Sequence, residues 1–188
     1  MQLLKKEYLI ISTLIIILVG IFTISNGMYI IIKEKSKINE EIIDYYEKEE
    51  NNEANNDYYA ILEIPKLNLH KVLYNPENNQ NNVNYNIEIL KQSKFPFFIV
   101  LAGHSGTGKT AYFKDLIKLD IDDIITIYHK KRQYTYKIIE IWQENRDGDI
   151  DLSPISLRSL VLTTCTKKDQ QLVILAVSEE KSEIVAKN

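Results

Sequence analysis

The chain has 188 residues, of which 45% are hydrophobic and 26% are charged, and its formal net charge is −3. This length allows one modest domain and an additional segment, and the composition is that of an ordinary globular protein. No basic block and no basic face interleaved with aromatic residues occurs, so nothing indicates a nucleic-acid partner. The one cysteine, Cys165, excludes an intramolecular disulfide and a multi-cysteine metal site, and the sequence implies no metal and no cofactor.

Residues 8–32 contain no charged side chain and are flanked by charged residues on both sides, after a short tail over residues 1–7. Because ~20 apolar residues suffice to cross a membrane as a helix, the segment predicts a single transmembrane signal anchor. A cleaved signal peptide would have a shorter apolar region of about 7–15 residues, followed by a cleavage site. Residues 26–28 make a poor cleavage site. Lysines on both sides leave the orientation undecided.

Residues 33–56 are rich in Glu, Lys and Asn, while isoleucines between Ile38 and Ile43 and then Tyr46 keep a helical spacing. This pattern predicts a polar stalk that begins as a helix and becomes a disordered linker. Such a spacer would hold a domain over residues 57–180 away from the bilayer, and residues 181–188 would form a C-terminal tail.

Strand signals dominate residues 57–180. Alternating or continuous apolar runs occupy residues 59–64, 97–102, 124–128, 134–138, 160–164 and 172–177. Pro65 suits a strand edge or bend, and alternation resumes at Leu67 and Leu69. The asparagine-rich residues 75–86 indicate a loop, and Lys130–Arg132 indicates a hairpin tip.

One short helix is expected over residues 111–118, where Phe113, Leu116 and Ile117 keep a helical spacing. Most connections between the strands are too short for parallel crossovers that carry helices. The sequence therefore predicts a mostly β, antiparallel domain with one or two short helices. A closed or nearly closed β-barrel is its simplest form.

Residues 103–110 read Gly-His-Ser-Gly-Thr-Gly-Lys-Thr and match the phosphate-binding pattern G-x-x-x-x-G-K-[ST]. A phosphate loop needs a parallel sheet with helices on both faces, and an acidic residue at the end of a second apolar strand to hold magnesium. The later apolar runs lead to Cys165 and Ser178 instead. A nucleotide hydrolase is therefore a remote alternative.

Cys165 and His104 both follow apolar runs. A thiol and an imidazole at two strand ends are the minimal pair for thiol acyl transfer. A lone cysteine is more often a small buried hydrophobe than a nucleophile, so from these residues alone both interpretations stay open.

The remaining polar candidates are weaker. His70 and His129 lie at polar strand or turn positions, which predicts surface residues without metal-ligand spacing. Four acidic residues have oxygen ligands suited to calcium, but a solvated acidic turn is the favoured interpretation of Asp120, Asp122, Asp123 and Glu140.

Three segments, in order, resemble the sortase family. Residues 161–165, Val-Leu-Thr-Thr-Cys, resemble the signature T-L-x-T-C, with Val161 in place of the first threonine. Residues 101–104 look like the strand that delivers the sortase histidine, and residues 62–67 are similar to the early L-x-I-P-x-I segment. The resemblance covers roughly residues 57–178, and three motifs in the right order are fairly specific.

The resemblance implies a β-barrel cysteine transpeptidase outside a cell membrane that its N-terminal helix crosses once. The Cys165 thiolate would form a thioester with a protein that bears an L-P-x-T-G-like sorting signal. His104 would protonate the leaving amine and then deprotonate the incoming amine, with water as a hydrolytic side path. The acceptor amine would belong to a peptidoglycan precursor or a pilin lysine.

The chain departs from the family at the arginine that sortases carry on the strand after the cysteine. The alignment places Gln171 there, or less plausibly Gln170. An amide still donates to a substrate carbonyl or oxyanion, but charge-assisted bonds are roughly twice as strong. Three explanations of the missing arginine stay open. Glutamine replaces it at some cost in binding strength, the side chain of Lys167 or Lys168 reaches the site, or the activity is weak. Thr164 is a second candidate for oxyanion or substrate binding. The alternative function is a weakly active or inactive sortase-like domain that binds peptides.

Overall fold

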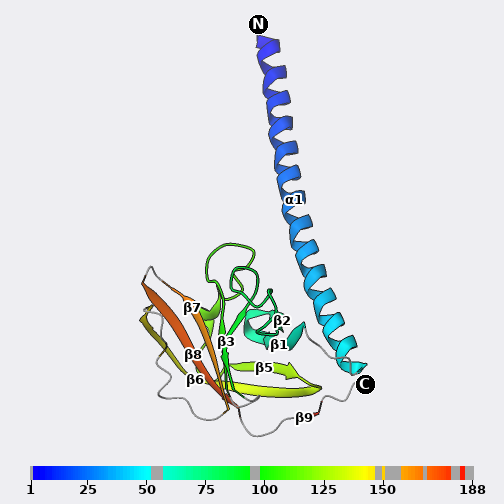
Figure 1. Ribbon diagram of the computed structural model, residues 1–188. Helices are drawn as coiled ribbons and strands as arrows, with labels where there is room; N and C mark the ends of the chain where they lie inside the picture. Colours follow the sequence, from blue (N-terminus) through cyan, green and yellow to red (C-terminus); the bar gives the residue numbers. More distant parts are fainter. Residues whose placement is uncertain are drawn as a thin grey trace. The chain divides into compact units, whose positions relative to one another are not determined.

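The computed structural model describes residues 2–51, 57–93, 98–146, 150, 158–166, 169–178 and 183–184 (Figure 1). The chain forms two compact units, residues 1–41 and residues 42–188. Helix α1 (Gln2–Glu50) runs from the first unit into the second.

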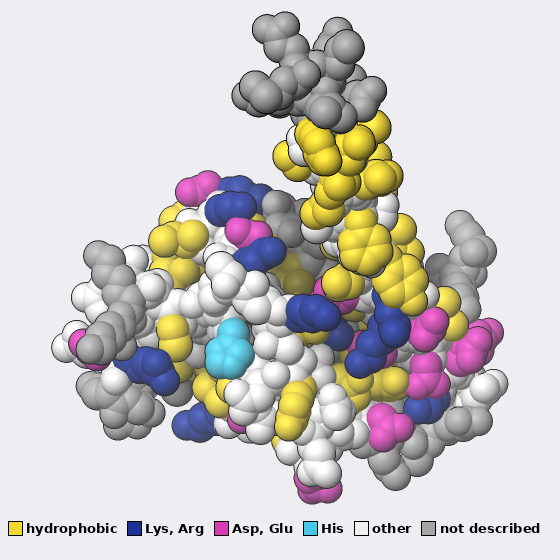
Figure 2. Space-filling view, turned by 90° about the horizontal axis from the view of Figure 1, so that it is seen from above, with side chains coloured by type: hydrophobic (Ala, Val, Ile, Leu, Met, Phe, Trp, Pro, Cys, Tyr) yellow, Lys and Arg dark blue, Asp and Glu magenta, His cyan; other side chains and the backbone are white. Residues whose placement is uncertain are grey.

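The first unit is helical throughout its described residues. Among the described residues of the chain, one helix is long and apolar enough to cross a membrane by length and composition. Its apolar side chains are exposed along this segment, where Figure 2 shows them gathered in yellow. This helix fits the transmembrane segment that the uncharged residues 8–32 predict.

The described part of the second unit contains one nine-stranded sheet. Its strands are β1 (Tyr58–Ile64), β2 (Leu69–Tyr74), β3 (Glu88–Gln92), β4 (Phe98–Ala102), β5 (Ile124–His129), β6 (Arg132–Asn145), β7 (Ser159–Cys165), β8 (Gln170–Ser178) and β9 (Glu183–Ile184). Eight follow the order β2-β1-β5-β6-β8-β7-β4-β3, and β9 pairs with β6. The end strands β2 and β3 also contact each other, which nearly closes the sheet. The predicted mostly β, nearly closed barrel is confirmed.

Strand β4 pairs with β7 in parallel, whereas the sequence predicts an antiparallel domain. The other ladders are antiparallel. The prediction considered only strands that follow each other in the sequence. A short connection excludes parallel pairing between the two strands that it joins, but not between strands further apart in the chain. Here β5 and β6 intervene between β4 and β7, so the chain has enough length to return in the same direction.

The segment after β1 turns back instead of continuing its alternation. Pro65 begins the 3₁₀ helix η1 (Pro65–Leu67), and Asn68 follows with a φ of 50°. Proline lacks the N–H that a ladder needs, and asparagine tolerates the left-handed region. Strand β2 therefore pairs antiparallel with β1, and Pro65 does lie at a bend.

The short helix expected over residues 111–118 forms only as turns and the 3₁₀ helix η2 (Leu116–Lys118). The Phe113 N–H donates to the His104 carbonyl at 3.0 Å, so it is not used in an α-helical ladder. The predicted hairpin tip is confirmed, since Lys130 and Lys131 join β5 to β6 with φ values of 48° and 59°. Two successive positive φ angles suit the twist of a tight hairpin.

The barrel interior is the main hydrophobic core and receives side chains from β1 to β8, with Phe113, Leu116 and Leu119 from the connection after β4. A smaller group lies on the outer face of β4, β7 and β8, and we call it the outer valine cluster. It consists of Val100, Val161, Val173 and Leu175, with Phe98, Trp142 and Ile150 packed against it. The alternation of side chains along each strand separates the two groups.

The last residues of α1 pack on a different outer face, formed by β1, β2 and β5. We call this group the tyrosine cluster: Tyr45, Ile61, Val72 and Tyr74, with Ile42, Tyr46, Tyr58 and Tyr128 against them. Tyr45 is 2% exposed, and its hydroxyl donates to the Tyr128 carbonyl at 3.2 Å. Residues 42–50, expected to belong to a polar stalk, therefore contact the barrel.

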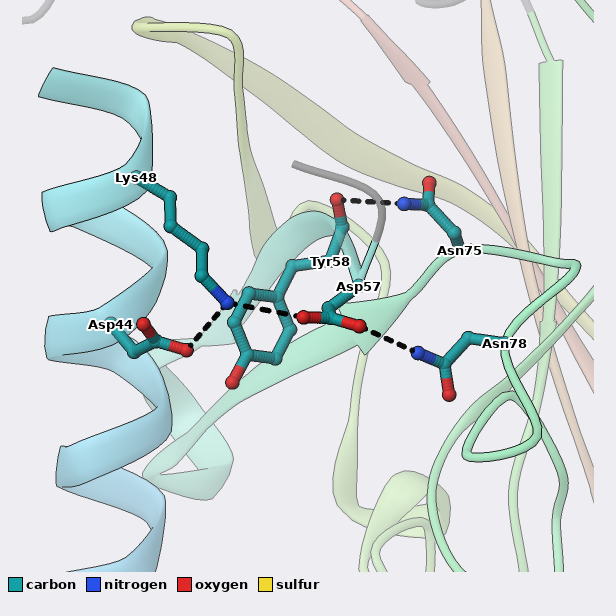
Figure 3. A network of polar contacts seen from close by, with 6 residues as sticks. All are labelled: Asp44, Lys48, Asp57, Tyr58, Asn75 and Asn78. Atoms are coloured by element: carbon teal, nitrogen blue, oxygen red, sulfur yellow. Dashed lines mark hydrogen bonds and ion pairs between the residues drawn. The ribbon is translucent and has the colours of Figure 1, made fainter. Parts of the chain in front are cut away.

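Polar contacts surround this packing (Figure 3). The Lys48 ammonium lies 3.0 Å from Asp44 and 3.1 Å from Asp57, and 4.9 Å from the ring centroid of Tyr58. The Asn78 amide donates to Asp57, and the Asn75 amide donates to the Tyr58 carbonyl. The start of β1 is thus connected both to the helix and to the asparagine-rich loop.

Candidate active site

Cys165 is the last residue of β7 and is a half-buried free thiol. Leu160 and Leu162 of the same strand point into the main core, while Val161 belongs to the outer valine cluster. Because side chains alternate along a strand, Thr163 and Cys165 lie on the same face as Val161. The strand therefore places the thiol at the end of the outer face.

His104 lies just beyond the end of the neighbouring strand β4, and its side chain is exposed. In the parallel register, Val100 is opposite Val161 and Ala102 is opposite Thr163. Two residues further along both strands are His104 and Cys165. Since paired strands lie ~4.8 Å apart, the parallel pair brings the two predicted site residues to corresponding positions at one end of the sheet.

Gly103 and Thr164 connect these two strand ends. The Gly103 N–H donates to the Thr163 carbonyl at 3.2 Å, and the Thr164 hydroxyl donates to the Gly103 carbonyl at 2.6 Å. A Cβ on Gly103 would lie 2.8 Å from the ring of Phe113, which explains the glycine. Thr164 is buried and opposite Leu172 of the main core, on the other face from Cys165. Its hydroxyl therefore holds the residue before His104.

Gln171 lies directly opposite Cys165 in the ladder between β7 and β8. The next strand, β6, places Glu144 opposite Gln171. The Gln171 Nε2 donates to the Glu144 Oε1 at 2.9 Å, and both side chains are half-buried. The sequence predicted Gln171 for this neighbourhood but missed Glu144. Lys167 and Lys168, the alternative donors, lie outside the described residues.

The outer valine cluster lies on the same outer face of the sheet as this row, and its members are buried, with exposures of 0–2%. Thr163, 5% exposed, has a hydroxyl without a hydrogen-bond partner. Val173 is opposite Thr163 on one side and Trp142 on the other. The Trp142 indole N–H donates to the Glu144 Oε2 at 3.0 Å, so both carboxylate oxygens of Glu144 accept a hydrogen bond. Cys165 and Gln171 are thus cross-strand partners at the end of this outer face, and His104 follows the end of the neighbouring strand.

The sortase domain family matches residues 62–179 of the chain. The chain belongs to the sortase family. Sortases are cysteine transpeptidases, and the matched range contains both the histidine and the cysteine segments.

Solved sortase structures share the barrel. Sortase A of Listeria monocytogenes is 19% identical with a TM-score of 0.58, over 70% of this chain and 92% of that one. A Clostridium perfringens sortase D5 transpeptidase is 21% identical with a TM-score of 0.56, over 77% and 94%. Sortase C1 from Streptococcus agalactiae is 25% identical with a TM-score of 0.56, over 66% and 69%. No protein of curated function matches the chain.

The phosphate-loop pattern of residues 103–110 has a different role in this sortase. Residues 106–110 form bends and turns, and in the described region that follows, the only helical segment is the 3₁₀ helix η2. A phosphate loop needs the N-terminus of a helix directly behind it. Glycine is needed at position 103 because the Phe113 ring leaves no space for a Cβ, and its backbone bonds to β7. The match with the pattern of nucleotide hydrolases is therefore coincidental.

The two remaining histidines differ from each other. His70 is exposed, as predicted. His129 is buried, contrary to prediction, because β5 directs it to the Tyr59 backbone: its Nδ1 lies 2.6 Å from the Tyr59 carbonyl. Burial lowers the pKa of His129, the Lys130 charge lowers it further, and the hydrogen bond to Tyr59 opposes both.

Three of the four acidic residues considered as calcium ligands form ion pairs with lysines. The Lys66 ammonium lies 2.6 Å from Asp120 and 2.7 Å from Asp123. Lys137 lies 2.8 Å from Asp122. These ammonium groups occupy carboxylate oxygens that a calcium ion would need, which favours the interpretation as a solvated turn.

Proposed function

We propose that this sortase is a membrane-anchored cysteine transpeptidase that acts on proteins with an L-P-x-T-G-like sorting signal. The observation that supports it is the parallel pairing of β4 and β7, which brings His104 and Cys165 to corresponding strand ends. The family membership supplies the reaction type.

In the first step, the Cys165 thiolate attacks the carbonyl carbon before the scissile bond. The C–N bond breaks, a thioester forms between the substrate and the sulfur, and His104 gives a proton to the leaving amine. The developing oxyanion needs donors directed at it. Gln171, opposite Cys165, is our candidate for one of them.

In the second step, His104 takes a proton from an incoming amine, which attacks the thioester. A new amide bond forms, the C–S bond breaks and the thiolate is restored. The acceptor is an amine of a peptidoglycan precursor or a pilin lysine, and water in its place gives hydrolysis. Thr164 contributes indirectly, because it holds Gly103 beside His104.

The anchor is the apolar helix over residues 8–32, and we place the catalytic barrel on the outer side of the cell membrane. The apolar helix of the first unit supports the anchoring. On this proposal the partners are sorting-signal proteins, an amine acceptor and the membrane.

The full chain in detergent, incubated with a fluorogenic L-P-x-T-G peptide, tests the proposal. We expect a thioester adduct on Cys165 by mass spectrometry, and its loss in Cys165→Ala. His104→Ala should slow its formation by at least ~100-fold, within the range that general acid–base catalysis contributes. The matched control, His70→Ala, removes an exposed histidine outside the site and should leave the rate unchanged. Cleavage that survives Cys165→Ala would contradict the proposal.

The second candidate function is a sortase-like domain that binds a sorting signal with little or no turnover. Gln171 favours it, since this residue at the arginine position brings no charge and its nitrogen donates to Glu144. Tight peptide binding without a thioester, together with no gain in Gln171→Arg, would select this candidate over the first.

A further inference from the structure

We propose that Glu144 is a positioning residue that orients the side-chain amide of Gln171 beside the Cys165 thiol. This inference rests on the proposed function and concerns the same site. It assigns a role to a residue of β6 that none of the three sortase motifs contains.

The geometry of the sheet provides the first argument. Cys165 on β7, Gln171 on β8 and Glu144 on β6 are direct partners in two adjacent ladders, so they form one row across three strands. Residues in one row project from the same face of the sheet. Gln171 therefore has the thiol on one side and the carboxylate on the other.

The chemistry of the contact provides the second argument. An ionised carboxylate only accepts hydrogen bonds, so the nitrogen of the amide, and not its oxygen, must face Glu144. The observed Nε2 to Oε1 distance of 2.9 Å fits this donation. Because the amide group is planar and is attached through the Cγ–Cδ bond, holding one N–H at Glu144 also sets the directions of the second N–H and the oxygen of Gln171.

Glu144 is itself held in place, which a positioning residue requires. Its second oxygen accepts the Trp142 indole N–H at 3.0 Å. The Trp142 side chain packs against the outer valine cluster beside the site. The carboxylate is thus held at both oxygens, and Trp142, which holds the second one, packs against a buried cluster.

This row shows how the chain arranges a neutral side chain where sortases carry arginine. A guanidinium carries its charge in every orientation, whereas a primary amide acts as a donor only when its nitrogen is directed correctly. By holding the Gln171 amide in one orientation, the Glu144 carboxylate compensates in part for the missing charge of the arginine.

Glu144→Ala, Glu144→Gln and Trp142→Phe are compared in the full chain in detergent, each with and without Gln171→Ala. We expect Glu144→Ala to slow single-turnover thioester formation roughly 10-fold, less than the ~100-fold that a 1 Å displacement at a reaction centre costs. Glu144→Gln keeps an acceptor oxygen and should recover most of the rate. Trp142→Phe keeps the ring packing, removes the indole N–H and should have a smaller effect. In the Gln171→Ala background all three should have no further effect.

A second measurement does not depend on turnover. The side-chain ¹⁵N–H₂ signals of Gln171, assigned by their loss in Gln171→Ala, should shift in Glu144→Ala and shift less in Trp142→Phe. Unchanged signals in Glu144→Ala would overturn the inference, as would equal rate losses with and without Gln171. If the wild-type chain forms no thioester, the proposed transpeptidation fails, and the Gln171 signals alone decide whether Glu144 orients the amide.

Discussion

Two outer faces of this barrel carry small apolar clusters, and the chain uses them differently. The tyrosine cluster over β1, β2 and β5 is covered by the end of α1, so Tyr45 is 2% exposed there. The outer valine cluster over β4, β7 and β8 is equally buried, with exposures of 0–2%, but none of its described members comes from α1. Cys165 ends one of its strands, and the exposed His104 follows another.

This difference predicts which substitutions will change stability and which will change the rate of acyl transfer. On the covered face the hydroxyl of Tyr45 donates to the Tyr128 carbonyl. On the other face the buried hydroxyl of Thr163 lacks a partner. Because Tyr45 combines a buried aromatic ring with a hydrogen bond, we expect changes on the covered face to alter the free energy of unfolding. Changes in the row beside Cys165 should mainly alter the rate of acyl transfer.

Tyr45→Ala tests the covered face and should have the largest effect on stability. Loss of a buried aromatic ring costs about 3–5 kcal/mol, so the free energy of unfolding, measured with urea, should fall by this order. Tyr85→Ala is the control, because Tyr85 is 58% exposed. The folded fraction of Tyr45→Ala should still form the thioester at the wild-type rate. An unchanged unfolding midpoint would show that residues 42–50 do not stabilise the barrel.

The adjacent threonines of β7, Thr163 on its outer face and Thr164 on its inner face, give a matched pair of predictions. Thr164→Val removes the donor to the Gly103 carbonyl, and loss of a buried hydrogen bond should cost about 1–3 kcal/mol. It should also slow thioester formation, because Gly103 precedes His104. Thr163→Val removes a buried hydroxyl that has no partner, so it should be neutral or stabilising. A larger loss of stability in Thr163→Val than in Thr164→Val would contradict this assignment.

Local patterns predicted β1, β4, β5, β6, β7 and β8, because each of these strands contains an alternating or continuous apolar run. They did not predict β3, which is short and polar at its end, or β9, which lies in the segment expected to be a C-terminal tail. The hairpin at Lys130 and Lys131 was also predictable, since two consecutive runs flank a short polar segment. The resemblance to sortases identified His104 and Cys165, and the family match covers both residues. Their catalytic roles stay predictions.

Contacts between distant segments were not predictable from local patterns. Glu144 meets Gln171 only because of the register of β6 and β8, which shifts at a bulge between Ile138 and Glu140. Tyr45 and Tyr128 are 83 positions apart, so no local pattern connects them. The polar composition of residues 33–56 therefore did not indicate that the end of the helix packs on the barrel. The residues that follow His129 in the sequence are polar and suggested an exposed hairpin, yet β5 directs its ring to Tyr59.

His129 should make stability depend on pH. Its pKa in the folded state lies below the ordinary value of 6.5, so the unfolded chain binds more protons as the pH falls below ~6.5. The free energy of unfolding should therefore decrease on acidification through this range. His129→Gln should reduce the slope, measured by urea unfolding above and below pH ~6.5. The exposed His70→Gln should keep it, and an equal slope in both variants would contradict the role of His129.

Lys48→Met should have the smallest effect and separates charge from packing on the covered face. The partners of Lys48 are largely exposed, with side-chain exposures of 44% for Asp44 and 58% for Asp57. Exposed ion pairs contribute about 0.2–1 kcal/mol, and methionine keeps an apolar stem against Tyr58. We expect a loss of about 0.5 kcal/mol or less that disappears at high salt, as screening predicts. A loss as large as that of Tyr45→Ala would mean that charges, and not aromatic burial, hold the helix end on the barrel.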